Sequence, residues 1–191
     1  MALLTKRVIM QTFQEMLEEM PFDRITVSAL VRRCGISSNT FYYHYQDIYA
    51  LLDVWAQTEL GRFIPAGDES VDWRQATREL LRECRAHPAT IYHVFNSLSR
   101  DRMEQYVFSM TDDVFYRMVQ QALNGQNMPE ARAREIAAFC RYAYIGFFMQ
   151  FLWNRMSGDI DQLVDRLGEL FATFITACIE KDGCAQPRQP E

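Results

Sequence analysis

Apolar residues recur every three or four positions along most of the chain, which is the spacing of one helix face. Ile9, Phe13, Leu17 and Met20 follow this spacing and predict a helix over about 5–20, which Pro21 ends. Gly and Pro are sparse, with 8 and 6 residues in 191, and this favours long helices over a turn-rich β fold. The same pattern predicts further helices over about 27–34, 38–43, 47–63, 71–87, 89–97, 101–123, 130–156 and 159–181. The sequence therefore predicts an all-α protein.

Two of the predicted helices are short and are joined by a tight turn. Thr26 is placed to cap the helix over 27–34, and Ser37 is placed to cap the helix over 38–43. Gly35 comes directly after the first of them, where a left-handed backbone is often needed. Two short helices joined by such a turn, the second with a small and polar first turn, are typical of a helix-turn-helix.

The second short helix carries side chains that suit contact with DNA. Its first turn is small and polar and lies at a helix N-terminus, an end that attracts phosphate. Phe41 and Tyr45 lie four residues apart, and we expect them to point inward and hold the helix on its base. The side chains left outside can reach the DNA backbone or base edges: Ser38, Asn39, Thr40, Tyr42, Tyr43 and His44.

The stretch ITVSALVRRCGISSNTFYYHYQDIYALL resembles the DNA-binding segment of TetR/AcrR-family transcriptional regulators. The positions that agree with the family pattern are Thr26, Val27, Leu30, Gly35, Ile36, Ser37, Thr40, Phe41, Tyr42, His44, Tyr45, Asp47, Leu51 and Leu52. The resemblance implies an N-terminal helix-turn-helix DNA-binding domain over 1–52 and a helical ligand-binding and dimerisation domain over 53–182. It implies phosphate contacts from Thr26, Ser37, Thr40, Tyr42 and His44, and base contacts from Ser28, Ser38, Asn39 and Tyr43.

Two positions depart from the family pattern. The family usually has Lys at the start of the fourth helix, where this chain has Ile48, and it often has Gly where this chain has Asn39. Residues 1–52 contain five basic and five acidic side chains, so their formal net charge is zero. These features predict weaker contact with the DNA backbone than is usual in the family, and an Asn39 amide that can pair with adenine.

The last two predicted helices carry more apolar surface than one protomer can easily bury. The stretch Tyr142–Trp153 is apolar on almost every side, and in a soluble protein such a helix is buried on every side. The helix over 159–181 has a wide apolar stripe. The pattern predicts a homodimer through a two-fold four-helix interface, made by helices 130–156 and 159–181 of each copy. The resembled family dimerises with its last two long helices as well.

Composition and charge narrow the class of protein and its compartment. Hydrophobic residues make up 49% of the chain, which is enough for a packed core. The formal net charge is −5, all of it in residues 53–191, so a polyanion should prefer the N-terminal part. The five cysteines are odd in number and widely spaced, which predicts reduced thiols and a cytoplasmic protein. The longest apolar run is shorter than the roughly 20 residues of a membrane span, no signal peptide is recognised, and residues 183–191 are expected to form a disordered tail.

The C-terminal domain is expected to bind a small-molecule effector, because regulators of the resembled family usually sense ligands there. The candidate lining residues are Tyr92, His93, Phe108, Phe115, Arg141, Tyr144 and Phe148. Taken one at a time, each of the aromatic candidates is more simply explained as core. The three histidines are scattered and the sequence lacks a Gly-rich phosphate loop, HExxH and GxSxG, so we expect no enzyme, no cofactor and no metal site.

The sequence therefore predicts a sequence-specific DNA-binding transcriptional regulator, a ligand-responsive homodimeric repressor of a pseudo-palindromic operator. Two alternatives stay open. A transcriptional activator of the same family is compatible with the sequence. The neutral charge of residues 1–52 and Ile48 are also compatible with a helical adaptor that descends from such a regulator and no longer binds DNA. The segment YIGFFMQFLWNRM resembles regulators of dihydroxyacetone utilisation, which is too little to name an effector.

Overall fold

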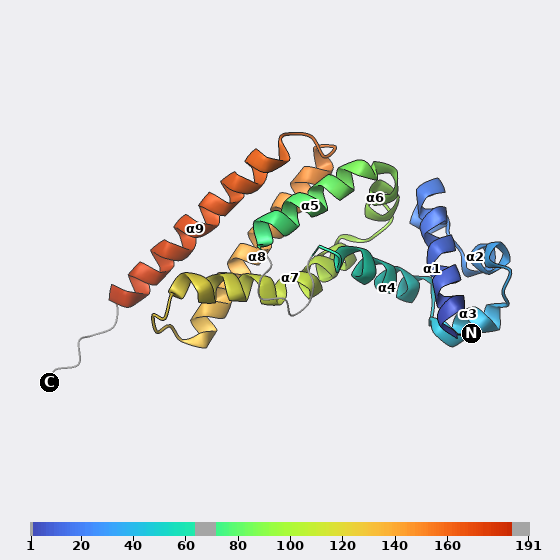
Figure 1. The fold of residues 1–191 in the computed structure, drawn as a ribbon, viewed down its shortest axis with the longest axis horizontal. Coiled ribbons are helices and arrows are strands. Elements are labelled where there is room, and N and C mark those ends of the chain that lie inside the picture. Colours follow the sequence, from blue (N-terminus) through green and yellow to red (C-terminus); the bar gives the residue numbers. More distant parts are fainter. Residues whose placement is uncertain (1, 64–71, 185–191) are drawn as a thin grey trace. The chain divides into compact units, whose positions relative to one another are not determined.

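The computed structural model describes residues 2–63 and 72–184, and within these ranges every regular element is a helix (Figure 1). The elements are α1 (Ala2–Glu19), the 3₁₀ helix η1 (Phe22–Arg24), α2 (Val27–Cys34), α3 (Ser38–His44), α4 (Ile48–Leu60), α5 (Trp73–Ala86), α6 (Pro88–Phe95), α7 (Arg100–Leu123), α8 (Glu130–Trp153) and α9 (Ile160–Cys184). The fold is all-α, as predicted, with the helix-turn-helix of α2 and α3 near the N-terminus.

The predicted helices are all present, and their ends move by at most three residues. The helix α1 begins at Ala2, three residues before the predicted start at residue 5. Residues 183 and 184 of the predicted disordered tail are helical, because α9 continues to Cys184. The rest of that tail lies outside the described residues.

The described helices belong to two compact units. The first consists of Met1–Gly67 with Arg82–Tyr106, and the second of Asp68–Leu81 with Val107–Glu191. The chain passes between the units inside α5 and inside α7, so each of these helices contributes to both. The predicted boundary at residue 52 divides the chain by function, and it stays a prediction.

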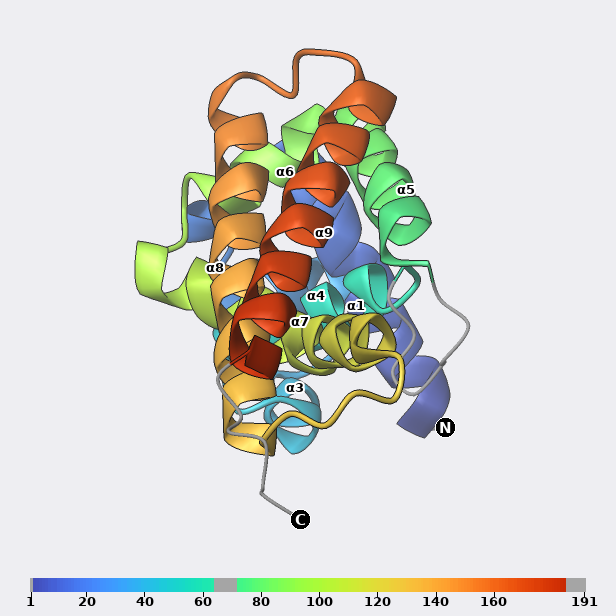
Figure 2. The same ribbon diagram turned by 90° about the vertical axis from the view of Figure 1, so that its left-hand side faces the viewer.

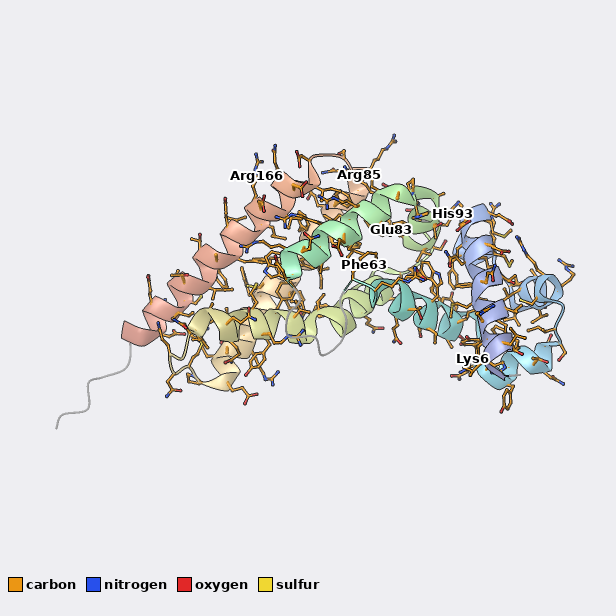
Figure 3. The ribbon with its side chains drawn as sticks, viewed as in Figure 1. Lys6, Phe63, Glu83, Arg85, His93 and Arg166 are labelled. Atoms are coloured by element: carbon orange, nitrogen blue, oxygen red, sulfur yellow. The ribbon has the colours of Figure 1, made fainter. Side chains whose placement is uncertain are left out.

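The first unit has an aromatic core at the centre of α1. The Phe13 side chain is fully buried, and its ring meets the rings of Phe22 and Trp55 edge-on, with centroids 6.2 and 6.5 Å apart. The helix α6 joins this unit through His93, whose Nδ1–H donates to the Leu17 carbonyl oxygen of α1 at 2.7 Å (Figure 3). That carbonyl lies in the last turn of α1, where the helix itself supplies no donor. Helix α6 is therefore attached to the same core that supports the helix-turn-helix.

The second unit has its own aromatic core between α7, α8 and α9. The buried Phe115 ring lies 5.4 Å from the Tyr144 ring and 5.8 Å from the Phe171 ring, measured between centroids. The Tyr144 hydroxyl also forms a hydrogen bond of 3.2 Å with the buried hydroxyl of Thr77 on α5. A polar tip inside an apolar core needs such a partner, because an unsatisfied hydroxyl there is costly.

Helix α5 is attached to α9 by two arginines. The Arg78 guanidinium lies between Asp161 and Asp165, with Nε 3.2 Å from the Asp161 Oδ1 and the Asp165 carboxylate hydrogen-bonded to Nη2. One turn earlier, Arg74 passes directly over Gly168, where an added Cβ would meet the Arg74 Nε at 2.1 Å. A glycine at position 168 therefore lets the guanidinium lie against the backbone of α9.

Helices α8 and α9 lie beside each other and leave an apolar face in solvent (Figure 2). We call this the α8–α9 face, and its residues are Phe139, Tyr142, Gly146, Trp153, Leu170 and Phe174. Tyr142 and Trp153 are each 62% exposed and Leu170 is 67% exposed. One protomer therefore leaves part of this apolar surface exposed, as the sequence analysis expected. Helix α8 is long and apolar enough to cross a membrane, but half of its most apolar stretch is buried inside the protein. The core helix of a soluble protein can have the same length and composition.

Candidate nucleic-acid interface

The first helix of the helix-turn-helix begins and ends as its sequence predicts. The Thr26 hydroxyl caps α2 by accepting from the Ala29 N–H at 3.2 Å. Gly35 ends the helix in the left-handed region, with φ of 67°. The Ile36 N–H then donates to the Val31 carbonyl oxygen at 3.1 Å, which satisfies a carbonyl that the helix leaves open. This turn fixes the point at which α3 leaves α2.

The second helix, α3, is capped by Ser37, whose Oγ accepts from the Thr40 N–H at 3.1 Å. The Ser37 and Thr40 hydroxyl oxygens are also 2.9 Å apart and share a hydrogen bond. Phe41 is fully buried and Tyr45 is 6% exposed, and their ring centroids are 5.7 Å apart. The predicted inward pair is confirmed, and desolvation raises the pKa of the Tyr45 phenol. This buried pair holds α3 on the core and turns its other faces outward.

The residues predicted to touch DNA lie on the outer faces of these two helices and of the turn between them. Tyr43 and Tyr42 are 80% and 55% exposed, and the ring centroids of Tyr43 and His44 are 5.0 Å apart. Thr40 and His44 are half-buried, and the exposed members of the set are Thr26, Ser28, Ser37, Ser38, Asn39, Tyr42 and Tyr43. Hydroxyl, amide and imidazole groups in this arrangement can bond phosphate oxygens and base edges. Their roles toward DNA stay predictions.

One charged residue of α2 has a structural partner that the sequence analysis missed. The Arg33 guanidinium bonds both carboxylate oxygens of Glu19 on α1, at 2.5 and 2.7 Å, and reaches Glu15 at 3.4 Å. The hydrogen bond from Arg33 lowers the pKa of Glu19, and the Glu19 carboxylate raises the pKa of Arg33. This fork joins α2 to α1 and leaves Arg33 less available to a phosphate. No local pattern reveals the pair, because its members are 14 and 18 residues apart.

The start of α4 is capped but uncharged. The Asp47 carboxylate accepts from the Ala50 N–H at 2.8 Å. Ile48, which replaces the expected lysine, is half-buried and packs against the core of the first unit. The neighbouring Tyr49 ring lies 4.2 Å from the Arg102 guanidinium of α7. An apolar side chain therefore occupies the position at which the family usually has a lysine.

Two family models match the chain. The model of bacterial regulatory proteins of the tetR family matches residues 9–54, which contain the helix-turn-helix. The model of a transcriptional regulator C-terminal region matches residues 71–173, which is more than half of the chain. The chain belongs to the TetR family. It is a DNA-binding transcriptional regulator, as predicted, in a family of regulators and not of enzymes.

Solved structures share the fold of this TetR-family chain. The dihydroxyacetone kinase operon activator DhaS is 14% identical, with a TM-score of 0.68 over 92% of this chain and 98% of that one. A TetR transcriptional regulator from Streptococcus agalactiae 2603V is 17% identical, with a TM-score of 0.61 over 91% and 94%. A regulator of the same family from Aquifex aeolicus VF5 is 16% identical, with a TM-score of 0.52 over 86% and 96%. At these identities the likeness shows the fold alone, and no curated protein matches the sequence.

The residues predicted to line an effector site are divided between the two compact units. Tyr92 and His93 belong to the first unit, and the His93 Nδ1–H is bonded within it. The candidates in the second unit are Phe108, Phe115, Arg141, Tyr144 and Phe148. Two pairs among them are in contact: Phe115 with Tyr144, and the Arg141 guanidinium 4.5 Å from the Phe108 ring centroid. Phe115, Tyr144 and Phe148 are buried core residues. A shared site for all seven stays a prediction.

Proposed function

We propose that this TetR-family regulator is a ligand-responsive homodimer that represses transcription by binding a pseudo-palindromic operator through α3. The observation that supports this best is the construction of α3: Phe41 and Tyr45 fix one side in the core, while Asn39 and Tyr43 stand in solvent on the other. A helix held in this way can enter a major groove as a rigid body. We assign residues 1–52 to DNA binding and residues 53–182 to effector binding and dimerisation, and we place the protein in the cytoplasm.

Within the DNA contact, we assign separate roles to the polar residues. Thr26, Ser37, Thr40, Tyr42 and His44 are assigned to phosphates, and Ser28, Ser38, Asn39 and Tyr43 to base edges. The Thr26 and Ser37 oxygens accept helix N–H groups, and each hydroxyl can still donate to a phosphate. Asn39 can pair with the N6 and N7 of adenine. If Asn39→Ala retains the wild-type preference among operator variants, Asn39 does not read a base.

We assign the α8–α9 face to a second copy of this chain. The face combines large exposed apolar side chains with the flat position of Gly146, where an added Cβ would meet no described atom within 4 Å. On each protomer it is made by two long neighbouring helices, and a two-fold axis would bring four helices together. Such an interface places two α3 helices on one duplex, about 34 Å apart or somewhat more.

The dimer is tested by one charge placed in the α8–α9 face. Leu170 is largely exposed in the protomer, so Leu170→Glu should fold but should sediment as a monomer and lose operator affinity. Val54→Glu is the matched control, because Val54 is also exposed and lies on α4, outside the face. We expect Val54→Glu to remain dimeric. A wild-type protein that sediments as a monomer at micromolar concentration would contradict this part of the proposal.

We propose an effector site in the second unit, among Phe115, Tyr144 and Phe148, with the Thr77 and Tyr144 hydroxyls as polar groups. A buried pair of hydroxyls among aromatic rings is the lining that small-molecule sites commonly use. An effector would relieve repression by binding better to a conformation whose α3 spacing no longer matches the grooves. For Tyr92, His93, Phe108 and Arg141, a place in this site stays a prediction.

Activation is the second candidate, and one comparison favours it. DhaS, which shares the fold, is an operon activator. The DNA contact would be the same in both cases, and the position of the operator relative to the promoter would decide the sign of regulation. A reporter gene behind the chain's own upstream region distinguishes the two. Repression predicts higher expression when this chain is deleted, and activation predicts lower expression.

DNA binding is tested with genomic fragments selected on the purified protein. We expect enrichment of a pseudo-palindromic sequence, and an affinity for it that falls steeply and linearly on logarithmic axes as salt rises. The helical-adaptor alternative predicts no retained fragment at any salt concentration. The neighbouring genes of enriched fragments would also indicate the chemistry of the effector.

A further inference from the structure

None of the nine residues assigned to the DNA contact is a lysine or an arginine. Affinity for duplex DNA comes largely from lysine and arginine side chains that displace counterions from phosphates. The usual lysine of α4 is replaced by the half-buried Ile48, and Arg33 is held by Glu19. The source of the electrostatic attraction must therefore lie elsewhere in the first unit.

The first turns of α1 carry two exposed cations, Lys6 and Arg7. Neither makes an ion pair with a residue that the structure describes, and no acidic residue occurs in residues 2–14. Both views place this end of α1 and helix α3 at the same lower end of the first unit (Figures 1 and 2), and Lys6 is labelled there in Figure 3. The two cations therefore lie at the same end of the first unit as α3.

Two other exposed cations of residues 1–52, Arg24 and Arg32, lie on other elements. Arg24 follows the opposite end of α1, and the 18 residues of that helix span about 27 Å. Arg32 lies in the last turn of α2, which Figure 1 draws above α3. The far end of α1 also carries Glu15, Glu18 and Glu19, which repel phosphate. The zero net charge of residues 1–52 thus conceals a separation of charge along α1.

This separation opposes the helix dipole at both ends of α1. The N-terminus of a helix favours acidic side chains and the C-terminus favours basic ones, by about 0.3–1 kcal/mol each near the surface. Helix α1 has no acidic residue in its first turn and no basic residue in its last turn. Arg33 compensates for Glu19 at the far end, whereas Lys6 and Arg7 have no such compensation among the described residues. A local rule that is broken without structural compensation points to a functional position.

We propose that Lys6 and Arg7 are the principal charged contacts of this chain to the DNA backbone, replacing the lysine that position 48 lacks. The proposal rests on the proposed function, because it requires α3 to face DNA. Two cations per protomer give four phosphate contacts per dimer. Neutralising them in the variant Lys6→Gln/Arg7→Gln should make the slope of log affinity against log salt about 3.6 less steep.

The experiment measures anisotropy of two labelled duplexes, the selected operator and a mixed-sequence 30-base-pair control, between 50 and 200 mM salt. On both duplexes, we expect the ratio of wild-type affinity to Lys6→Gln/Arg7→Gln affinity to fall about 100-fold as salt rises from 50 to 200 mM. Arg24→Gln/Arg32→Gln removes the same charge from η1 and α2, and we expect it to keep the wild-type slope. The charge-preserving variant Lys6→Arg/Arg7→Lys should keep it too.

Three outcomes would overturn the proposal. The first is that Lys6→Gln/Arg7→Gln keeps the wild-type slope of log affinity against log salt. The second is that Arg24→Gln/Arg32→Gln reduces this slope as much as Lys6→Gln/Arg7→Gln does. The third is that the charge-preserving variant Lys6→Arg/Arg7→Lys also reduces it. Unfolding is monitored separately, and Lys6→Gln/Arg7→Gln should melt no lower than wild type because it removes an unfavourable interaction with the helix dipole. Failure of the proposed function looks different, because the wild-type protein itself would then bind neither duplex.

Discussion

The backbone conformation of Gly35 makes a prediction whose size follows from the structure. Its φ of +67° lies in the left-handed region, yet an added Cβ would meet no described atom within 4 Å. Replacing Gly35 with alanine therefore costs conformational strain and no steric clash. For an L-residue that strain is about 1–2 kcal/mol. Asparagine tolerates the same conformation better, so Gly35→Asn should lose clearly less stability than Gly35→Ala.

The assay is urea unfolding followed by circular dichroism at 222 nm, with linear extrapolation to water and unchanged m-values. Gly125 provides an independent control in the second unit, because it has φ of +83° and equally open surroundings. We expect Gly125→Ala to cost a similar amount, about 1–2 kcal/mol. The reasoning would be refuted by a Gly35→Ala protein as stable as wild type, or by a Gly35→Asn protein less stable than Gly35→Ala.

Three further predictions concern the cap of α3, one ion pair and one thiol. Ser37→Ala removes the cap of α3 and should cost about 1 kcal/mol in urea unfolding, and no loss would show that the cap is dispensable. Arg33 lowers the pKa of Glu19 from its ordinary value of 4.5, so this stabilisation is present above about pH 4.5 and is lost as pH falls through the lowered pKa. Glu19→Gln should therefore melt below wild type at pH 7, and the difference should shrink as pH falls through the lowered pKa; a constant difference would contradict the ion-pair argument. Burial raises the pKa of Cys84 to about 12, so its thiol should react with iodoacetamide only after unfolding, and labelling of Cys84 in the native protein would be the contrary result.

Local chemistry explains which parts of the fold the sequence could predict. Thr26, Ser37 and Asp47 accept N–H groups three residues ahead, and Gly35 supplies a left-handed turn. Each of these features needs only a few neighbouring residues, so it can be read from the order of residue types. Phe41 belongs to the same class, because helical spacing alone fixes the side on which it lies.

Contacts between distant segments could not be predicted in the same way. The fork between Arg33 and Glu19 and the bond from His93 to the Leu17 carbonyl depend on how helices pack, and equivalent residues elsewhere on those helices look the same in sequence. The sequence does not identify what covers the exposed side of α8, for a related reason. An apolar helix shows that its surface needs a partner, but it does not show whether that partner is the same chain or a second copy.

The sequence predicted the polar residues of the candidate site but not its charged residues. The resemblance to TetR-family regulators assigns roles only to positions that lie within the family motif. These positions include the hydroxyl side chains and the Asn39 amide of α2 and α3. The resemblance gives no role to Lys6 and Arg7, which lie outside the matched motif. Their relation to α3 depends on the direction of α1 across the first unit (Figure 1).

The central claim is that two α3 helices of one dimer enter neighbouring major grooves of an operator. Methylation interference on the selected operator tests it directly, because dimethyl sulfate modifies guanine N7 in the major groove. We predict two clusters of interfering guanines on one face of the duplex, centred about 34 Å apart or somewhat more. A single cluster, two clusters on opposite faces, or interference confined to minor-groove positions would contradict the claim.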